Sequence, residues 1–137
     1  MHTCINLSDF RSSLFISPQE LQSLLNRADT PLLIDLRPQT RFDASPQMLA
    51  GARRCNLENV PALAAMLLAE NPHQEFVTYC VYGHQVSMGA AADLRAAGLK
   101  ARALAGGFEG GKDGVDNPQE IAKWRSTWLP TVAKDLP

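Results

Sequence analysis

One cysteine stands at the point where a strand-like run gives way to a loop and then to a helix. It lies in residues 76–92, FVTYCVYGHQVSMGAAA, where an apolar, β-branched and aromatic run stops at Cys80 and small helix-forming residues follow. In an open parallel sheet, ligands bind beyond the carboxyl ends of the strands. A cysteine at such an end therefore predicts nucleophilic chemistry carried by a thiolate.

The loop after Cys80 has the composition of a segment that surrounds an anion. Gly83 allows a tight turn, successive backbone N–H groups can turn toward the sulfur, and the helix that follows directs its positive end there. Both effects favour the thiolate. We therefore predict that Cys80 is the catalytic residue and that the loop binds substrate. The loop comprises Val81, Tyr82, Gly83, His84, Gln85 and Val86.

An inert core residue is the alternative interpretation of Cys80, since free cysteine is among the most buried residue types. Its place at the end of the run, before a loop, favours the functional interpretation. Cys4 and Cys55 have no comparable context and are expected to be structural. His84 is the only candidate cation between Cys80 and Ser87; it either assists proton transfer or is a solvated loop residue.

The composition is that of one globular domain. The chain has 137 residues, of which 45% are hydrophobic, so it can bury a core without disulfides or metal. A net charge of −1 argues against nucleic acid and against an anionic membrane surface as partners. The three cysteines are widely spaced and the three histidines share no ligand spacing, which argues against a disulfide framework and a metal site. We expect a cytoplasmic protein.

Helix and strand signals alternate along the chain. Apolar runs at 32–36 and 76–81, and shorter ones near 54–57 and 102–104, indicate strands. Helices are expected at 18–27, 60–70, 86–97 and from 118 onward. Ser17, Asn59 and Asn117 are the expected N-caps of the first, second and fourth of these helices. The alternation predicts an α/β domain at 14–130 with a mainly parallel sheet covered on both faces. Residues 1–13 are expected to be a lead-in and residues 131–137 a tail.

The chain resembles the rhodanese-like, or sulfurtransferase, domain over about residues 14–112. Three segments carry the resemblance. They are LLIDLRP at 32–38, similar to a strand ending in Asp-x-Arg; LAGARRCNL at 49–57, similar to a His-Ile-x-Gly-Ala-x-Asn-Ile segment; and YCVYGHQVSMGAAADLRAAGL at 79–99 with LAGGFEGG at 104–111. The last pair looks like the family's active-site strand, loop and helix, followed by its glycine turn.

This resemblance implies a five-stranded parallel sheet and a small sulfurtransferase. A persulfide, thiosulfate or mercaptopyruvate would load Cys80 as a persulfide, and a thiol, a protein cysteine or cyanide would then remove the sulfur. No metal or organic cofactor is required, and the protein is expected to be a monomer or a homodimer. Asp35 and Arg37 match the Asp-x-Arg of the family and are expected to support the loops around the site, with Arg37 paired to a carboxylate, for which Asp43 is the candidate.

The chain departs from the family pattern in the length and the charge of the loop. The loop is one residue longer than the usual six, as in the phosphatase and arsenate reductase branch, but the arginine of C-x5-R is Val86 here. The loop also contains no Lys or Arg, which favours a persulfide or protein donor over thiosulfate. A catalytically weak binding or regulatory module is therefore the alternative function. Redox sensing would need Cys55 as a resolving partner for Cys80.

Overall fold

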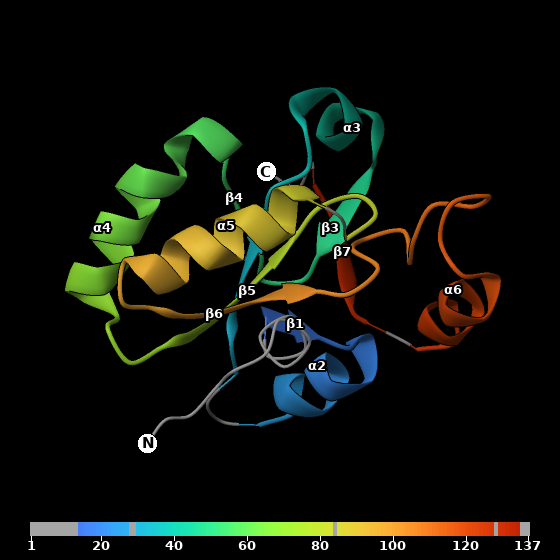
Figure 1. Cartoon of the computed structure of the whole chain (residues 1–137), viewed down its shortest axis with the longest axis horizontal. Helices are drawn as coiled ribbons and strands as arrows, with labels where there is room; N and C mark the ends of the chain where they lie inside the picture. The colour runs from blue at the N-terminus through green and yellow to red at the C-terminus, as the bar shows by residue number, and fades with distance from the viewer. Residues whose placement is uncertain (1–13, 28–29, 84, 128, 135–137) are drawn as a thin grey trace, which may run out of the picture.

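A five-stranded parallel sheet forms the centre of the molecule (Figure 1). The computed structural model describes residues 14–27, 30–83, 85–127 and 129–134. The strand order is β1-β6-β5-β2-β4, and every pairing in this sheet is parallel. Its strands are β1 (Phe15–Ile16), β2 (Leu32–Asp35), β4 (Arg53–Arg54), β5 (Glu75–Tyr79) and β6 (Lys100–Leu104). The predicted α/β fold with five parallel strands is confirmed.

Helices cover both faces of the sheet, as predicted. They are α2 (Pro18–Leu25), α3 (Gln39–Ala44), α4 (Val60–Glu70), α5 (Gln85–Ala96) and α6 (Pro118–Arg125), with a 3-10 turn, η1, at Leu57–Asn59. In Figure 1, α4 and α5 lie together on one side of the strands and α2 lies on the other. Alternation along β2 produces the two layers: Ile34 packs into the cluster with α4 and α5, and Leu33 into the cluster with α2.

Side-chain caps explain where two of the helices begin. Ser17 Oγ accepts a hydrogen bond from the Glu20 N–H at 3.0 Å, and Asn117 Oδ1 accepts two from the first turn of α6. Both caps are as predicted. The cap expected at Asn59 is wrong, because within the described residues its side chain makes no capping bond. The turn η1 runs directly into α4 there, so the backbone is already helical before the first residue of the helix.

Several short elements were not predicted from the sequence. A two-stranded antiparallel sheet joins β3 (Gln47–Leu49) to β7 (Thr131–Ala133), so residues 131–133, expected in a tail, form a strand. The helix α3 is longer than the single turn expected in residues 39–50. The strand expected at 54–57 ends at Arg54, because η1 begins at Leu57. Runs of two or three residues are too short to show a periodicity.

The central strand of the sheet is β5. It has β6 on one side and β2 on the other, and all its residues from Phe76 to Tyr79 are buried. The residue after Tyr79 therefore emerges at the middle of the carboxyl edge of the sheet, where ligands bind in such folds. No helix in the described part of the chain combines the length and the apolar character needed to cross a bilayer.

Candidate active site

Cys80 lies at the centre of this edge and lines a cavity. Cys80 follows the last residue of β5 and is 4% exposed. It lines a cavity of about 590 Å³. The other lining residues come from four parts of the chain; they are Pro38, Arg41, Val81, Tyr82, Gln85, Val86 and Val115. Cys80 is therefore nearly buried, yet it borders a cavity at the carboxyl edge of the sheet.

A hydroxyl group lies next to the sulfur. Ser87 Oγ is 3.2 Å from Cys80 Sγ, and Ser87 is fully buried in the first turn of α5. Its backbone oxygen accepts a hydrogen bond from Thr78 Oγ1 at 2.8 Å, which fastens the start of α5 to β5. Ser87 was expected only to let the helix pack close to the sheet, and it was not among the predicted site residues. Its spacing of seven residues from Cys80 was the available signal, because the first turn of the helix returns toward the strand end.

The backbone of the loop is held from behind by a glycine-rich turn. The carbonyl oxygens of Cys80 and Val81 accept hydrogen bonds from the N–H groups of Phe108 and Glu109, at 2.8 and 2.9 Å. In a trans peptide the N–H points away from the carbonyl oxygen, so the following N–H groups are directed to the opposite side. Gly83 has φ +77°, and a Cβ there would lie 2.5 Å from the Gly106 nitrogen. Only glycine fits this contact.

The remaining loop residues divide between the loop and the helix. Tyr82 and Gly83 lie in the loop, whereas Gln85 and Val86 are the first two residues of α5. Both helical residues still line the cavity of Cys80. His84 lies outside the described residues, so its proposed proton transfer stays a prediction. The prediction that loop N–H groups surround the sulfur also stays open.

One cation from outside the loop lines the cavity, a second lies near Tyr82, and neither was predicted from the sequence. Arg41 of α3 lines the cavity and donates a hydrogen bond from Nη2 to the Tyr82 hydroxyl at 2.9 Å. This bond raises the pKa of Arg41 above its ordinary value, so the guanidinium keeps its charge. Lys112 Nζ lies 5.9 Å from the centre of the Tyr82 ring, and the Arg41 guanidinium lies 5.3 Å from it. The loop contains no Lys or Arg, and Arg41 of α3 brings a positive charge to the cavity in their place.

Asp35 and Arg37 form a buried ion pair beside the site. Arg37 Nη2 lies 2.8 Å from Asp35 Oδ2, with exposures of 2% and 0%. The expectation that Arg37 pairs with Asp43 is wrong: Asp43 accepts a hydrogen bond from Gln39 on the same helix. The backbone turns at the end of β2, so that the Arg37 N–H also bonds to Asp35 Oδ1 and the two side chains meet. A buried guanidinium requires such a carboxylate.

This ion pair supports neighbouring elements and does not contact the sulfur. Tyr79 donates from its hydroxyl to Asp35 Oδ2 at 2.8 Å and accepts from the Leu49 N–H at 3.1 Å. Burial raises the pKa of Tyr79 far above its usual value, and the nearby Asp35 carboxylate is the second cause of this rise. Arg37 also donates to the Gln47 carbonyl oxygen at 3.0 Å. The network therefore connects β2 and β5 to β3, and neither Asp35 nor Arg37 lines the cavity of Cys80.

Cys55 is too far from Cys80 to act as its resolving partner without backbone movement. The strands pair in the register Arg54–Asp35–Tyr79, so Cys55 and Cys80 are separated by β2 and lie two strand spacings apart. That is about 10 Å between Cα atoms, beyond the reach of a disulfide. The Cys55 thiol donates to the Asn56 carbonyl oxygen, and burial raises its pKa. Cys55 is therefore a poor nucleophile.

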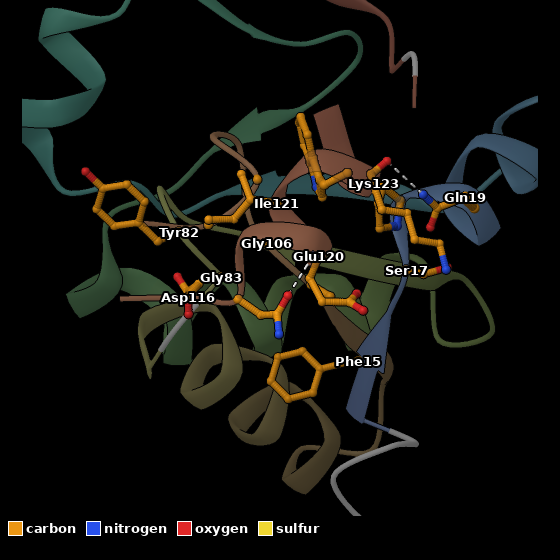
Figure 2. A pocket seen from close by; sticks show the side chains of 16 residues that line it. Phe15, Ser17, Gln19, Tyr82, Gly83, Gly106, Asp116, Glu120, Ile121 and Lys123 are labelled. Carbon is orange, nitrogen blue, oxygen red and sulfur yellow. Dashed lines mark hydrogen bonds between the residues drawn. The ribbon is translucent and has the colours of Figure 1, made fainter. Parts of the chain in front are cut away.

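A second cavity adjoins the loop from the other side (Figure 2). It measures about 430 Å³, and Figure 2 shows Tyr82 and Gly83 on its wall together with Phe15 and Glu120. Cys80 is not among its lining residues, whereas Tyr82 lines both cavities. Within the described residues, no group of three or more His, Cys, Asp or Glu side chains could hold a metal ion.

The sequence matches a family model over most of its length. Residues 17–113 match the model of the Rhodanese-like domain. Among proteins with curated descriptions, none matches the chain.

Solved structures share the fold. A rhodanese-like domain protein from Staphylococcus aureus gives a TM-score of 0.58 at 20% identity, over 74% of this chain and 95% of that one. A rhodanese-related protein from Thermoplasma volcanium gives 0.59 at 16% identity, over 85% and 95%. The As-Sb reductase from Leishmania major gives 0.55 at 24% identity, over 69% and 73%. At these identities the likeness establishes the fold alone, and activity has to be argued from the site.

Proposed function

Because the chain belongs to the rhodanese-like domain family, we propose that it is a sulfurtransferase whose Cys80 carries a sulfane sulfur as a persulfide. The position of Cys80 supports this most directly. The residue lies at the carboxyl end of the central strand and lines a cavity of about 590 Å³, and its sulfur lies 3.2 Å from the Ser87 hydroxyl oxygen. A thiolate in this position is accessible to a small donor and has a hydrogen-bond donor within reach.

The proposed sulfur transfer has two steps, loading of Cys80 by a donor and removal of the sulfur by an acceptor. The Cys80 thiolate attacks the outer sulfur of a donor R–S–S⁻, the donor S–S bond breaks, and R–S⁻ leaves with the electron pair of that bond. An acceptor thiolate then attacks the terminal sulfur of Cys80–S–S⁻, and breakage of that bond returns the Cys80 thiolate. With a persulfide or thiosulfate donor the sulfane sulfur keeps its oxidation state. With mercaptopyruvate a C–S bond breaks instead, and the electron pair leaves on carbon as the enolate of pyruvate, which is then protonated. Neither route needs an external oxidant, a metal or an organic cofactor.

The positive charges around Tyr82 favour an anionic donor. Arg41 lines the cavity, Lys112 lies near the Tyr82 ring, and both side chains are exposed. Together they attract a donor that carries a carboxylate or sulfonate group, such as a low-molecular-weight persulfide or mercaptopyruvate. They also make thiosulfate a better candidate than the loop composition alone indicates. A protein cysteine or a small thiol is the expected acceptor.

A binding or regulatory module, whose cysteine is not turned over, is the second candidate. The low exposure of Cys80, 4%, is the observation that favours it. Such a module would use the same cavity to recognise a partner, and its sulfur would not exchange with donors in solution.

Intact mass spectrometry separates the two functions. The reduced protein is incubated in turn with glutathione persulfide, thiosulfate and mercaptopyruvate. A sulfurtransferase gains about 32 Da, one sulfur atom, and loses it again when cyanide or a thiol is added. Cys80→Ser should gain nothing, whereas Cys55→Ser, the matched control, should gain the same mass as the wild type. No adduct with any of the three donors would refute the sulfurtransferase function and favour the binding module.

A further inference from the structure

The outward face of α4 is apolar along almost its whole length. The helix has the sequence VPALAAMLLAE, and its buried side chains, Val60, Leu63, Ala64 and Leu67, pack into the core. The exposed positions before Glu70 are Pro61, Ala62, Ala65, Met66, Leu68 and Ala69. Met66 and Leu68 are 39% and 40% exposed, and Leu57 in η1 is 49% exposed. A surface helix of a monomer normally carries charged residues on this face, so its composition indicates a partner.

A hollow adjoins this apolar face. A cavity of about 300 Å³ lies where α4 begins, between the helix and the end of β4. Its lining residues are Arg54, Cys55, Asn56, Asn59, Ala62, Leu63 and Met66. Ala62 and Met66 belong both to the hollow and to the exposed face. Protruding side chains and a recess therefore lie side by side on one surface. A two-fold interface requires this, because the same patch on both copies has to be complementary to itself.

Small residues allow a close approach at the middle of the helix. Ala62, Ala65 and Ala69 follow one another at spacings of three and four, so they lie along one stripe of α4. Met66 and Leu68 are exposed beside this stripe. A helix from a second copy can pack against the stripe while the longer side chains reach past it on either side.

The charges at the ends of α4 determine how two copies would face each other. The helix ends at Glu70, and its first turn contains no acidic residue. Arg54 lines the hollow at the start of the helix, where the positive end of the helix dipole also lies, and Glu58 is the one acidic residue of the short turn η1. Antiparallel helices would therefore place each Glu70 near a positive region of the other copy.

We propose that the exposed face of α4 is a homodimer interface, with the two helices antiparallel about a two-fold axis near Ala65. An 11-residue helix is about 16 Å long. Its face with Leu57 and the rim of the hollow is smaller than the roughly 800 Å² per partner of a standard stable interface, so a micromolar dimer is expected. None of the residues that line the Cys80 cavity lies on this face, so the dimer does not depend on the proposed sulfurtransferase activity.

Sedimentation velocity over a range of protein concentrations tests the proposal. The wild type should change from monomer to dimer in the micromolar range. Ala65→Glu places a charge on the two-fold axis and should raise the dissociation constant by at least about tenfold. Ala122→Glu makes the same substitution at an exposed alanine of α6 and should leave it unchanged. Circular dichroism melting of each variant verifies that it is folded.

Two further variants keep the test decisive if Ala65→Glu does not fold. Met66→Ser removes an exposed apolar side chain and should also weaken the dimer, because Met66 both protrudes and lines the hollow. Glu70→Lys should weaken the dimer through repulsion at low salt and less so at high salt. A wild type that stays monomeric at hundreds of micromolar overturns the proposal, as does a dimer that Ala65→Glu and Met66→Ser leave intact. A dimer that Glu70→Lys does not affect overturns the antiparallel arrangement.

Discussion

The hydroxyl oxygen of Ser87 lies 3.2 Å from the sulfur of Cys80, and both residues are buried. The contact joins the end of the central strand to the first turn of α5. Thr78 holds the same turn by a hydrogen bond to the Ser87 carbonyl oxygen. The start of the helix therefore cannot move from the sulfur without breaking two interactions. A hydroxyl fixed in this way is a ready donor to a sulfur anion, and a hydrogen bond to a charged partner is stronger than one between neutral groups.

Ser87→Ala should slow sulfur loading of Cys80. A hydrogen bond to a charged group contributes about 1.5–3 kcal/mol, so the rate should fall by roughly 10- to 160-fold. The measurement is kcat/KM for sulfur transfer from thiosulfate to cyanide. Ser87→Thr keeps the hydroxyl and should retain more activity than Ser87→Ala. An unchanged rate in a folded Ser87→Ala variant would show that this hydroxyl does not stabilise the sulfur.

Arg41→Ala should raise KM for anionic donors by about tenfold, because it removes a positive charge at the cavity. The effect on kcat should be smaller, since the guanidinium contacts Tyr82 and not the sulfur. The effect should also shrink as salt is added. Steady-state kinetics with thiosulfate at low and high ionic strength measure both changes. The matched control is Arg125→Ala, which removes an exposed arginine of α6 that pairs with Asp113. An equal rise in KM for this variant would contradict a local role for Arg41.

Substitution of two glycines by alanine should have opposite effects on stability. Gly83 has φ +77° and lies against the Gly106 nitrogen, so Gly83→Ala should destabilise the fold by about 2 kcal/mol or more and disrupt the loop. Gly89 lies in α5 with no atom within 4 Å of an added Cβ. Gly89→Ala should therefore stabilise the protein by about 0.5–1 kcal/mol. Urea unfolding measures both, and changes of the same sign would contradict the loop geometry.

Asp35→Asn should lower the free energy of unfolding by about 3–5 kcal/mol, because it leaves the buried Arg37 guanidinium without a compensating charge. The comparison is Asp43→Asn, which alters the exposed carboxylate that was expected to pair with Arg37. That change should stay within about 0.5 kcal/mol. Urea unfolding of the two variants distinguishes the observed pairing from the expected one, since the reverse order of effects would support Asp43.

The stability of the protein should decrease with pH in the alkaline range because of Tyr79. Its pKa is raised by burial and by the Asp35 carboxylate, so the folded protein keeps a proton that the unfolded chain releases above about pH 10. The contribution is complete below that pH and is lost at up to about 1.4 kcal/mol per pH unit above it. Tyr79→Phe should be less stable at neutral pH, because it loses hydrogen bonds to Asp35 and Leu49, but should show a shallower alkaline decrease in urea unfolding.

Elements with strong local signals were predictable. The helix at 60–70 was predicted with its observed bounds, and Ser17 and Asn117 marked two helix starts, because caps and apolar periodicity act within a few residues. The strands β3 and β7 were not predictable. Each is three residues long, and each forms only because a segment distant in the sequence supplies its partner.

The site was predictable where chain neighbours form it. Cys80 and its loop follow directly from the strand–loop–helix order. Arg41 and Lys112 were missed because they meet at Tyr82 only after the chain folds. The error about Asp43 has a related cause, since the preferred partner of Arg37 was decided by the backbone turn after β2 and not by the nearest exposed carboxylate.

Because Arg41 comes from α3, transfer of the cysteine loop alone to another protein would not reproduce the site. A peptide graft of residues 80–87 onto another parallel sheet would bring the thiol and the hydroxyl but neither positively charged side chain. It would also lack the glycine turn that holds the loop carbonyls. An engineered mimic therefore needs the helix after β2 and the segment after β6 as well as the cysteine loop.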